Sequence, residues 1–200
     1  HNAHGSFTSM PHLDTMDWTD DEHLQHIKRG TSHTWYVYDS AGQRVRKVTE
    51  KQGSLTEERI YLGGFEIYRK RQGTTVTLER ETLHLMDGAR RIAMVETKTV
   101  DSSPTSPLPV TVTRYQLDNH LQSASLELDE TASVISYEEY YPYGDTSYRS
   151  ARSGTEVSEK RYRYTGKEKD EETGLYYHGA RYYAAWLGRW TAADPSGMVD

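Results

Sequence analysis

The sequence of 200 residues contains no cysteine, which excludes disulfides, thiolate nucleophiles and cysteine zinc sites. It has no apolar run of about 18 residues, the length that predicts a membrane-spanning helix. Its first residues, HNAHG, lack the apolar core of a signal peptide. Basic residues are not in excess either: 24 Lys and Arg face 30 Asp and Glu, for a net charge of −6. This balance gives little support to a nucleic-acid partner.

Tyrosine, in contrast, is abundant. The chain has 16 Tyr and four Trp but only two Phe, and hydrophobic residues make up 34%. Tyr combines apolar area with a hydroxyl group that can reach water or a partner. This composition suits strands that pack on one face and are wet on the other. It also argues against a disordered chain, which would contain few aromatic residues.

Short strand-like segments follow one another from Thr34 onward. The segment from Phe65 to Arg69 alternates strictly between apolar and polar residues, which is typical of a half-buried strand. Turn signals separate the segments: residues 39–42 (DSAG) suit a type I turn, and Asp87-Gly88 suits a hairpin. Strands at roughly ten-residue spacing with glycine-bearing turns predict an all-β, antiparallel chain.

The pattern divides the chain into three parts. Residues 1–33 are polar and hold six of the nine histidines, and we interpret them as a segment cut from preceding repeats. Residues 34–117 contain repeated strands, interrupted at 101–109 by a loop with three of the six prolines. Residues 118–200 form the third part and are the richest in tyrosine. Repeats of this kind bury their apolar faces only against their neighbours.

Several short motifs carry a resemblance to a known family. Residues 36–45 (YVYDSAGQRV) resemble the YD repeat of Rhs proteins, and residues 9–13 (SMPHL) resemble repeat regions of toxin-complex C subunits and secreted Rhs toxins. A single Tyr-Asp pair would be unspecific. The order of five motifs near the end, however, is specific to the Rhs-associated core: YRYTGKE (162–168), ETGLYY (172–177), GARYY (179–183), LGRW (187–190) and DPSG (194–197).

The resemblance implies a fold and a function. In this family, YD repeats wind into a hollow β-shell, and the associated core plugs one end and acts as an aspartyl autoprotease that releases a C-terminal toxin. We therefore expect an antiparallel YD-repeat sheet that is a segment of a hollow Rhs β-shell. The expected partners are the chain's own C-terminal toxin domain and the rest of the Rhs shell, with no nucleic acid, metal or cofactor. Such proteins are secreted or delivered by a toxin-injection system.

Arg181 and Asp194 match the family's autoprotease positions. An aspartic site needs two carboxylates that share one proton, and a nearby arginine can keep one of them ionised. The family's second Asp-Pro-x-Gly motif is absent from this sequence, so we expect an incomplete site and an inactive chain. Ala184-Ala185 also depart from the acidic residue and proline that many relatives carry. The alternative for Asp194 is a turn residue, because DPSG is favourable turn chemistry.

Other interpretations stay open. His23 and His26 have the i, i+3 spacing of two metal ligands on a helix, although exposed loop histidines are commoner. Residues 160–172 alternate in charge sign, which predicts a solvated hairpin, and Arg189 is placed to stack on Trp190. The alternative function is a YD-repeat cell-surface adhesin or carbohydrate-binding protein. An independent hydrolase has no supporting motif in the sequence.

Overall fold

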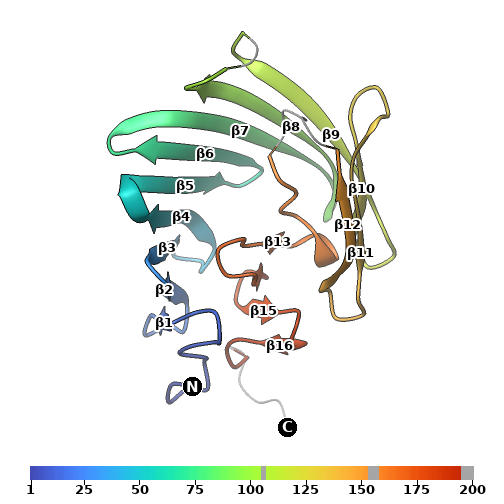
Figure 1. The fold of residues 1–200 in the computed structure, drawn as a ribbon. Coiled ribbons are helices and arrows are strands. Elements are labelled where there is room, and N and C mark those ends of the chain that lie inside the picture. The colour runs from blue at the N-terminus through green and yellow to red at the C-terminus, as the bar shows by residue number, and fades with distance from the viewer. Residues whose placement is uncertain (105–106, 153–157, 195–200) are drawn as a thin grey trace.

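The computed structural model describes residues 1–104, 107–152 and 158–194, and consists of two antiparallel sheets (Figure 1). Strands make up 56% of the described residues and helix 3%. The prediction of an all-β antiparallel chain is therefore confirmed, since an average domain has roughly 20–25% strand.

The large sheet has twelve strands, and each pairs with its neighbours in the sequence. The strands are β1 (Thr15–Trp18), β2 (Leu24–Arg29), β3 (Ser32–Tyr38), β4 (Arg44–Lys51), β5 (Leu55–Leu62), β6 (Phe65–Gln72), β7 (Thr75–Asp87), β8 (Arg90–Asp101), β9 (Val110–Asp118), β10 (Ala124–Leu128), β11 (Val134–Tyr140) and β12 (Thr146–Ala151). Two single-turn 3₁₀ helices lie within the described ranges, η1 (Gln52–Ser54) and η2 (Tyr164–Gly166).

One kind of turn recurs between the strands. The side chain of Asp39 accepts hydrogen bonds of 2.9 Å from the backbone N–H groups two and four residues further on, between β3 and β4. Asn119 and Asp129 do the same between β9 and β10 and between β10 and β11. Gly42 closes the first of these turns at a φ of 73°, a conformation that favours glycine. The local chemistry read from DSAG is therefore the chemistry that reverses the chain.

The small sheet lies on the concave side of the large one (Figure 1). It contains β13 (Glu168–Lys169), β14 (Tyr176–Tyr177), β15 (Tyr182–Ala184) and β16 (Arg189–Trp190). We call residues 158–194, which include this sheet, the inner segment. The large sheet curves around the inner segment, so residues far apart in the sequence meet across the space between them.

An apolar cluster joins the inner segment to the first strands. Leu13, Met16 and Ile27 are at most 2% exposed, and they pack with Leu175 and Tyr182 of the inner segment. Residues 1–33 thus contribute β1, β2 and much of this cluster to the large sheet. The predicted boundary at residue 34 falls inside β3, and that at 118 falls at the end of β9. The three-part division of the chain stays a prediction.

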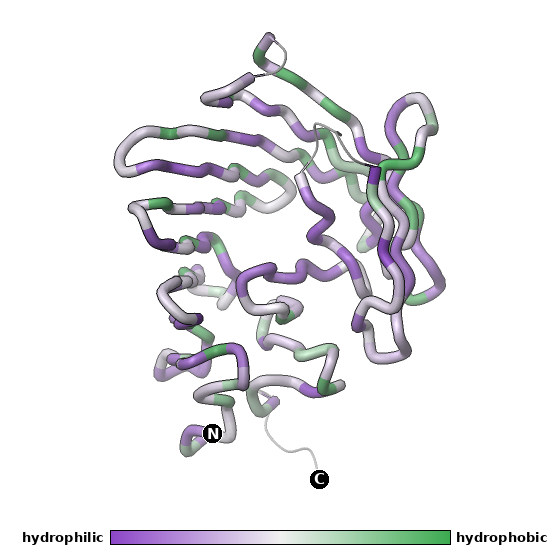
Figure 2. The backbone as a smooth tube through the Cα atoms, in the orientation of Figure 1, coloured by the Kyte–Doolittle hydropathy of each residue, from purple (hydrophilic) through white to green (hydrophobic). Residues whose placement is uncertain are grey.

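Away from the apolar cluster, the large sheet carries its charges on the concave face. On β7, Thr82 and His84 are buried and face the inner segment, whereas Leu83 and Leu85 are 44% and 40% exposed on the other face. Leu62 and Tyr115 are exposed as well. In Figure 2, the stretch that leads into β13 is correspondingly hydrophilic. No helix in the described ranges is long and apolar enough to cross a membrane.

Candidate functional site

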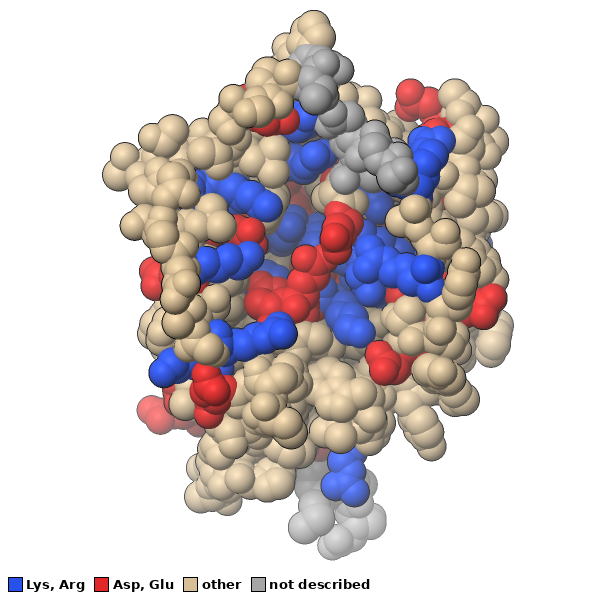
Figure 3. All heavy atoms as spheres, viewed as in Figure 1, with Lys and Arg blue, Asp and Glu red and all other residues tan. Residues whose placement is uncertain are grey.

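Charged side chains fill the contact between the inner segment and the concave face, and Figure 3 shows them gathered in its hollowed centre. We call this contact the charged seam. The prediction of a solvated hairpin over residues 160–172 is wrong, because five charged side chains of this run are at most 9% exposed: Lys160, Arg161, Arg163, Glu168 and Asp170. Their alternating signs pair with opposite charges on the large sheet instead of with water.

Arg44 of β4 is the centre of one group in the seam. Its Nη1 lies 2.7 Å from Asp170 Oδ2 and its Nη2 lies 2.6 Å from Glu168 Oε2. Lys47 adds a bond of 2.8 Å to Asp170 Oδ1. Burial raises the pKa of Glu168, but Arg161 and Arg44 outweigh it and bring this pKa to about 2. Glu168 is therefore ionised, and its charge is neutralised inside the protein.

Arg114 of β9 forms a second group. Its two terminal nitrogens lie 2.6 Å from Glu96 of β8 and 2.6 Å from Glu127 of β10. Nη1 also donates to the backbone carbonyl of Ser158, at 2.8 Å, which ties the start of the inner segment to the sheet. Arg114 is 2% exposed, so this guanidinium exchanges nearly all of its hydration for protein oxygens.

Glu66 of β6 is the hub of a third group. Its Oε2 accepts from Arg161 at 2.6 Å and from Arg59 at 3.2 Å, and its Oε1 accepts from His84 Nε2 at 2.9 Å and from the hydroxyl of Tyr162. Burial works against its charge, but Arg161 and His84 hold the pKa of Glu66 well below the usual range. Three strands, β5, β6 and β7, and the inner segment thus meet at one carboxylate.

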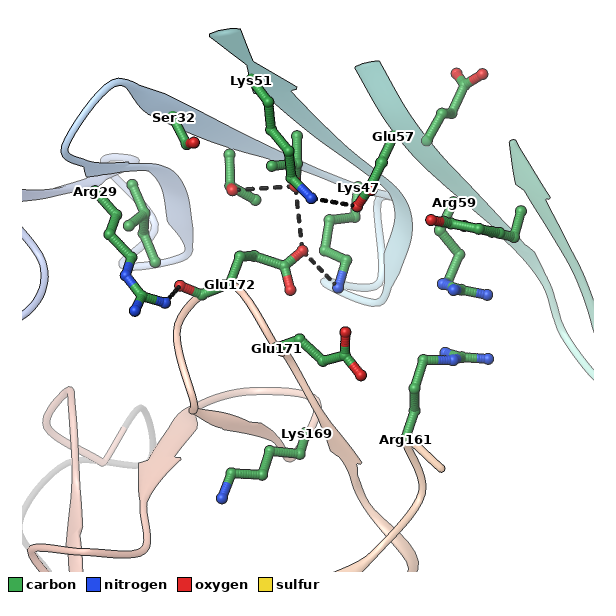
Figure 4. Close-up of a pocket in the computed structure, with 15 residues that line it drawn as sticks. Arg29, Ser32, Lys47, Lys51, Glu57, Arg59, Arg161, Lys169, Glu171 and Glu172 are labelled. Carbon is green, nitrogen blue, oxygen red and sulfur yellow. Dashed lines mark hydrogen bonds and ion pairs between the residues drawn. The ribbon is translucent and has the colours of Figure 1, made fainter. Parts of the chain in front are cut away.

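A hollow of about 350 Å³ lies between β2–β6 and the inner segment (Figure 4). Lys47 bonds Glu172 at 2.9 Å and Lys51 bonds Glu57 at 2.9 Å along its wall. The pKa of Glu171, which also lines the hollow, is raised by burial and then by its contact with Glu159. Such a lining favours water or a polar chain over an apolar small molecule, whose sites are mostly apolar.

Arg181 and Asp194 form an ion pair with 2.8 Å between Nη2 and Oδ2. The two residues that match the family's autoprotease positions are therefore in contact, whereas their catalytic role stays a prediction. The arginine on the Trp190 ring is Arg181, at 4.4 Å, and not Arg189 as the sequence suggested. The pair is partly open to solvent, since Asp194 is 48% exposed. The turn expected at 194–197 lies outside the described residues beyond Asp194.

Sequence reasoning missed the aromatic support of this pair. Trp190 packs edge-on against His178, at 4.9 Å, and against Tyr183 at 5.2 Å. Burial, followed by the charges of Lys167 and Arg181, lowers the pKa of His178 to about 4, so this imidazole is neutral at pH 7. The only available signal was the dense aromatic composition, which does not say which ring meets which cation.

The histidine pair proposed as metal ligands has other partners. β2 is a strand and not a helix, so helical spacing does not apply to it. His26 bonds Asp17 through Nδ1 at 2.7 Å and His33 through Nε2 at 2.9 Å, while the His23 ring packs on Tyr38. Within the described ranges, no group of three or more His, Asp or Glu is arranged to hold a metal ion.

No protein-family model matches the chain. The chain is 42% identical over 169 residues to toxin subunit YenC1 of Yersinia entomophaga, which covers 82% of this chain and 17% of YenC1. It is 40% identical over 168 residues to toxin subunit YenC2 of the same organism, with the same coverage of each chain. The chain thus spans about a sixth of the length of these curated relatives.

Solved structures give the same picture for the fold. The crystal structure of TcdB2–TccC3 superposes with a TM-score of 0.85 at 36% identity, covering 98% of this chain and 10% of that one. The large sheet and the inner segment together therefore have a counterpart in an experimental structure. The chain is a homologue of the YenC toxin subunits with the fold of the matching part of TcdB2–TccC3, in agreement with its resemblance to Rhs proteins of the toxin-complex C subunit type.

Proposed function

We propose that this chain is part of an Rhs shell that encloses a C-terminal toxin polypeptide, and that Arg181 and Asp194 belong to the aspartyl autoprotease site that releases it. The observation that carries the proposal is the curved sheet wrapped around an inner segment in which the Rhs-associated core motifs occur in order. The likeness to toxin subunits supports a role in a toxin-complex shell. Secretion or delivery by a toxin-injection system follows from that role.

The concave face supports temporary enclosure. Where the inner segment leaves this face open, at the hollow of Figure 4, the lining is mostly charged, with Lys51 paired to Glu57. A wall of this kind offers an enclosed polypeptide few apolar contacts, so it does not hold exposed hydrophobic segments tightly. The alternative, an adhesin that binds carbohydrate by its aromatic side chains, would instead use the outward surface.

The chemistry assigned to the site is hydrolysis of a peptide bond. Asp194, kept ionised by Arg181, accepts a proton from water as the water oxygen attacks the scissile carbonyl carbon. A second, protonated carboxyl group then supplies a proton to the leaving amine as the C–N bond breaks. One ionised carboxylate performs only the first half, so we predict that the 200-residue chain does not cleave itself.

The test uses a chain extended through the family's second Asp-Pro-x-Gly motif and a few residues beyond it. We expect a C-terminal fragment to appear on a denaturing gel, and Asp194→Asn to slow its appearance by about a hundredfold or more. Asp118→Asn, which changes an aspartate that pairs with Arg90 on the large sheet, is the matched control and should cleave normally. Both variants should keep their far-UV circular dichroism.

Two outcomes would count against the proposal. Undiminished cleavage by Asp194→Asn would show that another residue activates the water. Absence of cleavage in the extended chain, with the fold intact, would favour the adhesin alternative. That alternative would then be tested by measuring binding of the chain to a glycan array.

A further inference from the structure

Arg91 of β8 differs from the other arginines of the concave face in its partners. Its Nε donates to His84 Nδ1 at 2.9 Å, its Nη1 donates to the carbonyl of Gly166 at 3.4 Å, and its guanidinium lies 3.5 Å from the centre of the Tyr162 ring. None of these partners is a carboxylate. Nδ1 of His84 accepts the hydrogen bond from Arg91, and Nε2 of the same ring lies 2.9 Å from Glu66 Oε1.

Arg44, Arg114 and Arg161 each lie within 2.7 Å of at least one carboxylate oxygen. Within residues 1–104, 107–152 and 158–194, Arg91 makes no such contact. Burial accordingly lowers the pKa of Arg91, whereas the carboxylates raise the pKa of the other three. Arg91 is thus a partly buried cation with no carboxylate at contact distance in the described residues.

The guanidinium also has donors to spare. Of its five N–H groups, two are taken by His84 and Gly166, which leaves three without a partner in the described part of the chain. The side chain borders open space, because Arg91 lines two hollows, of about 590 and about 180 Å³. Lys167 lines both hollows too and is exposed. Two cations therefore face space that a ligand can enter.

We propose that Arg91, assisted by Lys167, binds a carboxylate group from an acidic polypeptide segment. The terminal nitrogens of arginine match the two oxygens of a carboxylate in bidentate geometry. A single negative charge suits the site better than a phosphate dianion, since Glu66 and Glu168 lie within electrostatic range of Arg91. The enclosed polypeptide as the source of this carboxylate rests on the proposed function, whereas the site itself does not.

The experiment measures binding of a tetraglutamate peptide, blocked at both ends, to the 200-residue chain by titration calorimetry at low salt. We expect Arg91→Gln to weaken binding by about tenfold or more, and Lys167→Gln by about two- to threefold. Arg46→Gln is the matched control, because Arg46 is a half-exposed arginine of β4 that pairs with Glu58 and is not among the residues that line either hollow. It should change the affinity by less than about twofold.

Side-chain NMR of Arg91 supplies a readout that needs no variant. The chemical shift of its Nε–H group should change as acetate is added and reach a plateau at high acetate concentration. Chloride at the same ionic strength should not cause this change. Tighter binding of phosphate than of acetate would overturn the assignment to carboxylates. A tetraglutamine peptide that binds equally well, or equal losses in Arg46→Gln and Arg91→Gln, would show that Arg91 only packs on Tyr162.

A folding defect would not obscure the result. If Arg91→Gln unfolds, Arg91→Lys keeps a cation over the Tyr162 ring but cannot bind a carboxylate in bidentate fashion, and it should still weaken peptide binding. The measurement requires neither self-cleavage nor a toxin. Its failure would therefore leave the autoprotease proposal standing, and failure of self-cleavage would leave the carboxylate site standing.

Discussion

The inner segment is attached to the large sheet in two different ways. Near the N-terminus, Leu175 and Tyr182 pack into the apolar cluster with Leu13, Met16 and Ile27. Further along the sheet, the charged seam replaces that packing with ion pairs around Arg44 and Glu66 and, at the start of the inner segment, with a hydrogen bond from Arg114 to Ser158. One continuous contact thus changes from non-directional burial to directional, desolvated charge.

The difference has consequences for stability. Apolar burial stabilises in proportion to area and tolerates small shifts of the side chains. A buried ion pair, in contrast, contributes little net stability relative to apolar residues of the same size, yet losing one partner leaves a buried charge uncompensated. The apolar cluster therefore supplies stability, while the charged seam specifies one position of the inner segment.

Arg114→Ala should have the largest effect. It removes the cation between Glu96 and Glu127, and we expect a loss of about 3–5 kcal/mol in the free energy of unfolding, measured by urea denaturation at pH 7. As a control, replacing Arg114, Glu96 and Glu127 together by Met and Leu should recover most of the lost free energy of unfolding, because no buried charge is then left unpaired. A loss below about 1 kcal/mol in the free energy of unfolding for Arg114→Ala would mean that water solvates the carboxylates of the charged seam.

Acid should weaken the charged seam and spare the apolar cluster. The pKa of Glu168 is about 2 in the folded protein, below the ordinary value of about 4.3 in the unfolded chain. Its contribution is therefore complete above about pH 5 and is lost as the pH falls toward 2. For this carboxyl alone, the loss is on the order of 3 kcal/mol.

Urea denaturation between pH 7 and pH 2 measures this loss, and Glu168→Gln should flatten the pH dependence. Leu175→Ala is the comparison from the apolar cluster: it should lower stability by a similar amount at every pH. If Leu175→Ala altered the pH dependence as strongly as Glu168→Gln, the two halves of the contact would not be separable.

The smallest effect is expected at the solvent edge. Lys51 and Glu57 are 2.9 Å apart at the hollow of Figure 4, but the Lys51 side chain is 38% exposed. Lys51→Gln should change the free energy of unfolding by less than about 1 kcal/mol, and the change should fall further in 1 M salt. If Lys51→Gln lowered the free energy of unfolding as much as Arg114→Ala, the charged seam would have to include this solvent-exposed pair.

Turn motifs in the sequence predicted the large sheet well, because a hairpin is formed by residues that are close together in the chain. DSAG at residues 39–42 and Asp87-Gly88 each connect two strands that pair as a hairpin.

The structure of the inner segment was harder to predict from the sequence. The sign alternation of residues 160–172 has the same appearance in a solvated hairpin and in a buried seam, and the partners of this run, such as Glu66 and Arg44, lie about a hundred residues away.

The candidate site was predicted only as far as the motif reached. The match to the Rhs-associated core brought Arg181 and Asp194 together, and the structure places them in contact. No pattern in the sequence indicated that Arg181 would stack on the Trp190 ring. Nor did any pattern indicate that Arg91 would contact His84 and Tyr162 and no carboxylate among the described residues. Both facts depend on the curvature of the large sheet and on the path of the inner segment.

The strand order also determines a sequence of events during synthesis. Because β1 to β12 pair strictly with their neighbours in the chain, each hairpin can close soon after its second strand emerges, at little cost in loop entropy. The inner segment follows all twelve strands. Until it docks, the charges on the concave face remain in water, so we expect the expulsion of that water from between the charged partners to be a late step of folding.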